Sequence, residues 1–72
     1  RVNSVSPGMI DTPLWDKLSG DARRAQYAAT AGRLPVRRVG RPDDVARAVL
    51  YLAGNGYATG TTAVVDGGTA IA

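Results

Sequence analysis

Two β-branched stretches and one amphipathic stretch stand out in the pattern of hydrophobic and polar positions. Val2 and Val5 precede a Pro-Gly pair, which predicts a short strand that runs into a tight turn. Residues 62–65 predict a second strand, which the Asp-Gly-Gly sequence after it would close. Between these strands, residues 42–53 carry apolar side chains at helical spacing. The pattern indicates a strand, a long helical connection and a second strand.

The amphipathic stretch predicts the clearest helix of the chain. Pro42 suits its first turn, and Asp43 and Asp44 place negative charge there, which interacts favourably with the helix dipole. Gly54 begins the sequence GNG that we expect to end the helix. The expected apolar stripe consists of Val45, Ala48, Val49 and Leu52, widened by Ala46, Leu50 and Ala53.

The stretch between the first strand and this helix is weakly hydrophobic. Thr12 suits a helix cap and Pro13 a first helical position. Residues 22–31 favour a second helix, with Gly32 as the expected stop. We interpret residues 12–32 as a mobile, two-piece helical lid. The loop that follows it has three expected anchors, which are Leu34, Val36 and Val39.

This order of elements predicts two parallel neighbouring strands joined by a right-handed crossover. Parallel sheets are buried on both faces and contain several strands. Two strands with helices on one side would leave sheet edges and one face uncovered. The predicted fold class is therefore α/β, as part of a larger parallel sheet and incomplete on its own.

Length and composition agree with part of a larger domain. A chain of 72 residues buries only about 60% of its unfolded surface, and it has no cysteine for a disulfide and no histidine for an ordinary zinc site. It begins with Arg1, inside a predicted strand, so we expect the C-terminal piece of a longer polypeptide. The sequence has no apolar run of membrane-spanning length and no signal-peptide pattern. We expect a cytoplasmic protein with no membrane partner.

The net charge of +3 comes almost wholly from arginine. Arg33, Arg37, Arg38 and Arg41 gather in one stretch, which is either a phosphate or nucleic-acid patch or a solvated loop. We favour the solvated loop, and hence no nucleic-acid partner, because no aromatic residue alternates with the arginines. A small basic binding or assembly module, with nucleic acid as a candidate ligand, is the competing interpretation.

Three further motifs receive a structural interpretation. The glycine-rich sequence from Gly54 to Gly60 does not fit a dinucleotide-binding loop, because the predicted helix precedes it and the predicted strand follows it. Ser4 and Ser6 have no histidine to activate them for hydrolysis. Asp66, before two glycines, is expected to form a turn rather than to bind a metal.

Two stretches of the chain resemble one enzyme family. Residues 2–12, VNSVSPGMIDT, resemble the N-x-V-S-P-G-x-I-x-T segment of the short-chain dehydrogenase/reductases, which are nicotinamide-dependent oxidoreductases. Residues 40–68, GRPDDVARAVLYLAGNGYATGTTAVVDGG, resemble the last crossover helix and last strand of that family. The resemblance implies a Rossmann-like, doubly wound parallel sheet, NAD or NADP as cofactor, and hydride transfer to or from a small carbonyl or alcohol substrate.

The resemblance also implies roles at the Pro-Gly turn. Pro7 and Gly8 would shape the wall beside the nicotinamide. Ile10 would offer its backbone to the carboxamide, and the Thr12 hydroxyl would contact the carboxamide or the pyrophosphate. The alternative is a purely structural role, in which Pro-Gly only forms a turn and Thr12 only caps a helix. The lid would overhang the nicotinamide, and three of its residues either line a substrate pocket or pack against the rest of the lid: Leu14, Trp15 and Leu18.

The catalytic acid/base residues of this family are absent from the sequence. The family uses a tyrosine with a lysine four residues later, and none of Tyr27, Tyr51 and Tyr57 has a lysine at that spacing. The 72-residue chain alone is therefore expected to be inactive.

The resemblance divides the chain into three parts of one domain. Residues 1–12 would form the strand and the nicotinamide-side turn, residues 13–40 the substrate lid, and residues 41–72 the last helix and strand. The expected partners are the remainder of the same Rossmann domain and further copies of the protein, which would contact one another through residues 42–53 and 62–66.

Overall fold

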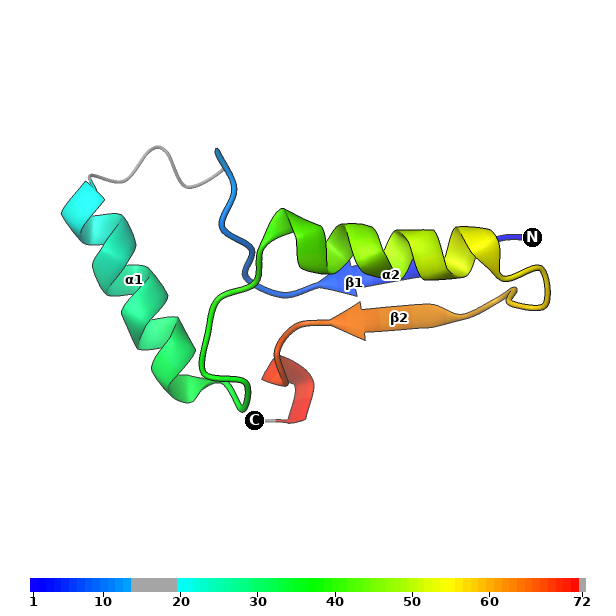
Figure 1. The fold of residues 1–72 in the computed structure, drawn as a ribbon. Coiled ribbons are helices and arrows are strands. Elements are labelled where there is room, and N and C mark those ends of the chain that lie inside the picture. Colours follow the sequence, from blue (N-terminus) through cyan, green and yellow to red (C-terminus); the bar gives the residue numbers. More distant parts are fainter. Residues whose placement is uncertain (14–19, 72) are drawn as a thin grey trace.

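The computed structural model describes residues 1–13 and 20–71. In chain order the elements are β1 (Ser4–Pro7), α1 (Gly20–Arg33), α2 (Pro42–Gly54), β2 (Thr62–Val65) and the short 3-10 helix η2 (Thr69–Ile71) (Figure 1). The first piece of the predicted lid falls largely on residues 14–19. Its three candidate substrate residues, Leu14, Trp15 and Leu18, therefore lie outside the described residues.

β1 and β2 lie side by side and point the same way. Ser4 lies opposite Thr62, and Pro7 lies opposite Val65. α2 runs along the two strands and packs on both of them (Figure 1). The predicted parallel pairing and the α/β fold class are confirmed.

α2 packs on the strands through a narrower stripe than predicted. Leu52 is enclosed, with 6% of its surface exposed, and Val45 and Ala48 are half-buried. Val49 and Leu50 belong to the predicted stripe, yet they are 49% and 70% exposed. Two strands cover only one side of a helix, so side chains on the flanks of the stripe remain in contact with solvent.

α1 extends further than the helix predicted over residues 22–31. Its last turn contains Arg33, and a basic side chain is favourable at the negative end of the helix dipole. The helix ends there because Leu34 precedes Pro35, and the residue before a proline disfavours helical backbone.

The loop between α1 and α2 is anchored mainly by Leu34, which is 6% exposed. Val39 is half-buried, as expected of an anchor. Val36 was also predicted to be an anchor, but it is 55% exposed. Its side chain packs on Gly67 and not in a core. A Cβ added to Gly67 would lie 2.8 Å from Val36 Cγ2.

The turn after β2 is organised by Asp66 and two glycines. The Asp66 carboxylate accepts hydrogen bonds from the N–H groups of Gly68 at 2.9 Å and Ala70 at 3.1 Å, so the predicted turn-forming role is confirmed. Gly67 and Gly68 have φ values of 64° and 100°, which lie in the left-handed region that favours glycine. Pro35 packs directly on Gly68, which joins this turn to the segment after α1.

The segment before β1 holds the connector between α2 and β2. The Arg1 guanidinium donates to three backbone carbonyls at the end of α2 and in the connector, those of Leu52, Ala53 and Ala58. The Asn3 amide bonds the same connector with both its nitrogen and its oxygen. The glycine-rich sequence 54–60 lies in this region, after a helix and before a strand, as predicted.

Candidate functional site

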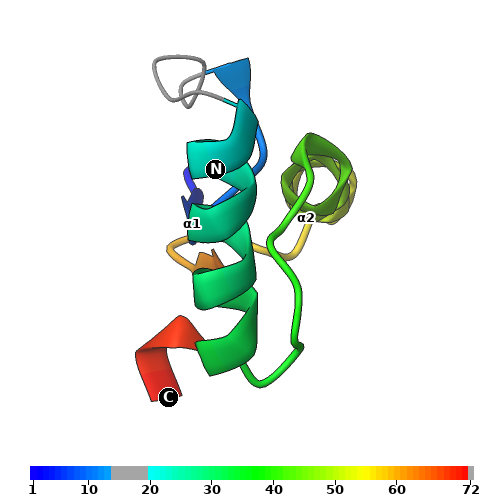
Figure 2. The same cartoon turned by 90° about the vertical axis from the view of Figure 1, so that its left-hand side faces the viewer.

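The carboxyl ends of β1 and β2 point toward α1, which stands across them (Figures 1 and 2). A groove of about 460 Å³ opens at this end. In open α/β sheets, ligands bind in the crevice outside the carboxyl ends of the strands. The groove walls come from the turns after β1 and β2 and from the segment after α1, and they include Met9, Ile10, Leu34, Val36, Val65 and Ile71.

The Pro-Gly turn brings the chain against the end of β2. The Gly8 N–H donates to the Val65 carbonyl at 3.0 Å. A Cβ on Gly8 would lie only 2.8 Å from the Cα atom of Asp66, which no side chain could accept without a backbone shift. Glycine is therefore required at this position for a close approach between two backbone segments.

The chain beyond this turn is clamped to the segment before α2. The Asp11 N–H donates to the Gly40 carbonyl at 2.9 Å, and the Gly40 N–H donates to the Met9 carbonyl at 3.0 Å. A Cβ on Gly40 would lie 2.6 Å from the Ile10 side chain, so Ile10 fills the space beside it. These contacts close the base of the excursion, by which we mean residues 12–39 between β1 and α2.

Thr12 follows this clamp and is half-buried. Within residues 1–13 and 20–71, neither its hydroxyl nor its N–H has a hydrogen-bond partner. A threonine hydroxyl can both donate and accept a hydrogen bond. Thr12 can therefore bind a polar group of a ligand without giving up an existing contact.

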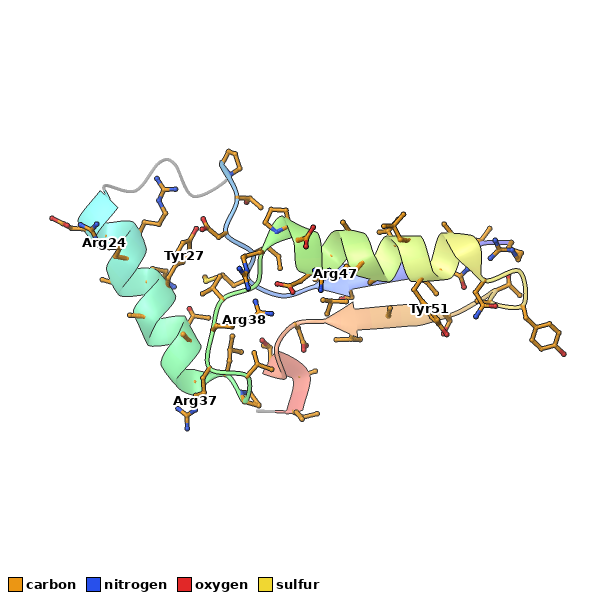
Figure 3. All side chains as sticks on the ribbon, viewed as in Figure 1. Arg24, Tyr27, Arg37, Arg38, Arg47 and Tyr51 are labelled. Atoms are coloured by element: carbon orange, nitrogen blue, oxygen red, sulfur yellow. The ribbon has the colours of Figure 1, made fainter. Side chains whose placement is uncertain are left out.

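α1 reaches the same turn through one aromatic side chain. The Tyr27 hydroxyl donates to a carboxylate oxygen of Asp11 at 2.9 Å, and Figure 3 shows the side chain directed from α1 toward the turn. Partial desolvation, followed by the hydrogen bond and negative charge of Asp11, raises the pKa of Tyr27. The phenol therefore stays protonated at neutral pH and remains a donor.

A second polar link ties the excursion to α2. The Arg38 guanidinium donates to both carboxylate oxygens of Asp44, at 2.8 and 3.0 Å (Figure 3). Asp44 also accepts the Arg41 N–H at 2.8 Å, so the predicted helix-start role of Asp44 is confirmed. The hydrogen bonds from Arg38 and from the Arg41 backbone hold the pKa of the Asp44 carboxyl well below its usual range.

The predicted basic stretch is partly used by the fold itself. Arg38 neutralises Asp44 at the start of α2. Arg37 donates to the Gly32 carbonyl at 2.7 Å, which satisfies a backbone acceptor at the end of α1. Two of the four arginines therefore stabilise helix ends rather than form a continuous basic face.

The described part of the chain lacks two further kinds of site. Residues 1–13 and 20–71 contain no group of three or more aspartate, glutamate, histidine or cysteine side chains that could hold a metal ion. None of the helices in these two segments is long and apolar enough to cross a membrane.

The predicted cofactor residues lie along one continuous turn. Ile10 lines the groove directly. Pro7 ends β1, Gly8 packs on the end of β2, and Thr12 lies beyond the clamp at the base of the excursion. The four residues therefore follow one another where the chain leaves the carboxyl end of β1, and Ile10 is the one of them that lines the groove.

The sequence analysis assigned no role to Asp11 and did not pair Tyr27 or Arg38 with a partner. Tyr27 carried one usable signal, because it is the single aromatic residue of an otherwise alanine-rich helix. Its partner lies sixteen residues earlier, on another element. Helical periodicity indicates which residues share a face, but it does not identify a contact of this kind.

Comparison with known proteins adds independent information. A family model described as enoyl-(acyl carrier protein) reductase matches residues 1–70. The chain is 41% identical over 73 residues to the 3-oxoacyl-(acyl-carrier-protein) reductase FabG of Thermotoga maritima, covering 99% of this chain and 28% of that protein. It is 43% identical over 70 residues to cis-4-hydroxycyclohexanecarboxylate dehydrogenase of Sinomonas cyclohexanicum, covering 94% of this chain and 26% of that protein.

A solved structure also resembles the fold of this chain. The crystal structure of a small-chain dehydrogenase in complex with NADPH superimposes with a TM-score of 0.89 and 44% sequence identity, over 94% of this chain and 31% of that one. The fold thus places the chain among Rossmann-type α/β proteins. The chain belongs to the short-chain dehydrogenase/reductase family. It spans under a third of the length of these relatives.

Proposed function

We propose that this chain is part of an NAD- or NADP-dependent oxidoreductase that transfers hydride between its cofactor and a carbonyl or alcohol carbon. One observation carries the proposal. Two parallel strands end beside an open groove, and the first of them runs into the Pro-Gly turn; this end of the sheet is where α/β enzymes bind nucleotides. The NADPH bound to a structural neighbour that is 44% identical supports the nature of the cofactor.

The turn after β1 would hold the nicotinamide end of that cofactor. Pro7 and Gly8 form the wall, and the Ile10 backbone and Thr12 hydroxyl bind the carboxamide. The half-buried, unpartnered Thr12 hydroxyl fits such a polar group. The cofactor, when bound, supplies or accepts the hydride. The residues of this chain orient it and take no part in proton transfer.

The excursion would form the substrate lid within residues 13–40. α1 stands across the carboxyl ends of the strands, where it would exclude water from the reacting groups (Figure 2). Leu14, Trp15 and Leu18 would contact the substrate. The relatives carry names with different substrates, a carrier-protein thioester and a cyclic hydroxy acid. We therefore assign the substrate only as a carbonyl or alcohol compound.

The remaining surface would contact other parts of the enzyme. The uncovered face and edge of the two-stranded sheet would pack against the remainder of the same domain, which would also supply the catalytic tyrosine, lysine and serine. Residues 42–53 and 62–66 would form subunit contacts, and three exposed apolar side chains in these ranges support that role: Val49, Leu50 and Val64. The 72-residue chain alone should show no turnover.

Replacement of Thr12 tests the cofactor role. Thr12→Val in the intact polypeptide removes the hydroxyl and keeps the side-chain shape, and should weaken NADPH or NADH binding about three- to tenfold, as expected for the loss of one hydrogen bond. Nicotinamide fluorescence titration measures this change. Thr61→Val, at an exposed position before β2, is the matched control and should bind like the wild type.

The outcomes of this titration separate the protein's function from the role of one residue. A wild-type protein that binds neither NADH nor NADPH contradicts the proposed function. Normal binding by Thr12→Val, in a wild type that does bind cofactor, removes Thr12 alone from the site.

A further inference from the structure

Asp11 joins three elements of the structure. Its N–H donates to the Gly40 carbonyl, which fixes it to the segment before α2. Its carboxylate accepts the Tyr27 hydroxyl, which fixes it to α1. Its position between Ile10 and Thr12 makes it part of the turn at the groove. A displacement of α1 can therefore reach the turn through Asp11.

Among the described elements, α1 packs less on the others than they do on one another. The elements that pack extensively on one another are β1, β2 and α2, and α1 is not among them. The C-terminal end of α1 is held where Leu34 and Pro35 contact the glycines after β2. Nearer its middle, the Tyr27–Asp11 bond is the link to the turn (Figure 3).

The Tyr27 hydroxyl is oriented by charged groups from two elements. Asp11, on the side of the turn, accepts the hydrogen bond that the hydroxyl donates. Arg23, one helical turn before Tyr27, also lies at the hydroxyl, and its charge acts on the tyrosine in the sense opposite to that of Asp11. A phenol between a cation and a carboxylate has a defined direction of donation, toward the carboxylate.

We propose that Tyr27 is a positioning residue for the nicotinamide site: through its bond to Asp11, it couples the position of α1 to the turn that contains Ile10 and Thr12. This inference rests on the proposed function. Coupling between two sites is reciprocal. Cofactor bound at the turn therefore orders α1, and α1 held across the groove strengthens cofactor binding.

Tyr27→Phe in the intact enzyme tests this coupling, because it removes the hydroxyl and keeps the ring. In the wild type, cofactor should slow amide hydrogen exchange in residues 22–31. In Tyr27→Phe this protection should be lost, and the Kd for cofactor should rise about two- to tenfold. Tyr57→Phe is the matched control, since Tyr57 is fully exposed between α2 and β2, and it should behave like the wild type.

A double-mutant cycle separates the coupling from independent effects. Asp11→Ala should raise the cofactor Kd about as much as Tyr27→Phe, and the double variant should be no weaker than either single variant. Asp11→Asn keeps an oxygen acceptor and should restore most of the binding. A merely structural role for Tyr27 would lower the melting temperature without removing the cofactor-dependent protection of α1.

Two results would overturn the inference, and they can be told apart. If the wild type binds cofactor but Tyr27→Phe keeps both its affinity and the protection of residues 22–31, the coupling is absent while the proposed function stands. If Asp11→Ala and Tyr27→Phe raise the cofactor Kd additively, the coupling is likewise absent while the proposed function stands. If the wild type binds no nicotinamide cofactor, the proposed function and the coupling fail together.

Discussion

The strand–helix–strand unit and the excursion are held together in different ways. In the unit, β1 and β2 share a backbone ladder, and α2 packs on both through the enclosed Leu52. In the described part of the excursion, residues 20–39, the contacts include the enclosed Leu34 and single polar links. The Tyr27–Asp11 bond links α1 to the turn after β1, and the Arg38–Asp44 pair links the segment after α1 to α2. The unit has many mutually supporting contacts, whereas the excursion has a few that act separately.

This difference separates a scaffold from the part that we propose to act as a lid. Lids and binding loops come from the less stable parts of a protein, because they must open without unfolding the rest. The clamp formed by Met9, Asp11 and Gly40 marks the boundary, since it closes the base of the excursion. Changes in the unit should therefore affect the whole domain, and changes in the excursion should act locally.

Truncation of Leu52 should have the largest effect on stability. Leu52→Ala leaves a cavity between α2 and the strands and should lower the free energy of unfolding of the intact domain by about 2–5 kcal/mol. Urea denaturation measures this change. Hydrogen exchange should accelerate in β1 and β2 as well as in α2, because the three elements share one core.

Leu50→Ala on the same helix is the matched control. Leu50 is 70% exposed within this chain and is proposed above as a subunit contact, so in the dissociated domain its truncation should change the free energy of unfolding by less than about 0.5 kcal/mol. Equal losses for the two variants would mean that the rest of the domain covers both faces of α2. The distinction between the enclosed stripe and the exposed flank would then be wrong.

Gly8→Ala should have the next largest effect, because it acts at the contact between β1 and the end of β2. The new methyl group would meet the Asp66 backbone at 2.8 Å, and the resulting shift should cost about 1–3 kcal/mol. Thermal denaturation of the intact protein measures it. Gly56→Ala meets nothing within 4 Å and should be close to neutral. A neutral Gly8→Ala would show that the two turns can separate freely.

The scaffold could be predicted from the sequence because its elements are specified locally. The residues around Pro42 and Asp44 define the start of α2, the GNG sequence defines its end, and chain connectivity implies parallel strands. The pairing of Ser4 with Thr62 could not be predicted, since four-residue strands carry too little alternation to set a register. The exposure of Leu50 could not be predicted either, because it depends on how many strands lie beneath α2.

The site could be predicted only where one residue type restricts the backbone. Gly8 indicated a close approach, although the partner, Asp66, is distant in sequence. The Tyr27–Asp11 bond depends on how far a side chain reaches between elements, and no periodic pattern encodes that distance. The same holds for Arg38, which was expected in a solvated loop and is paired with Asp44.

Asp44→Asn should have the smallest effect, and that effect should depend on pH. The folded structure lowers the pKa of Asp44 below its unfolded value, so the contribution to stability is present above the unfolded pKa and is lost as pH falls below it. At pH 7 the variant should melt below the wild type. The difference should shrink as pH falls through about 4, where the unfolded carboxyl takes up its proton. Melting curves at a series of pH values measure it.

Asp43→Asn is the matched control for the neighbouring charge. Asp43 pairs with Arg47 at 3.2 Å, but both side chains are largely exposed, and such pairs contribute little. Asp43→Asn should therefore change the melting temperature less than Asp44→Asn at pH 7. Hydrogen exchange should locate the Asp44 effect in residues 33–41 and the first turn of α2, because the Arg38–Asp44 pair joins these segments. Faster exchange spread through β1 and β2 would instead make this pair part of the scaffold.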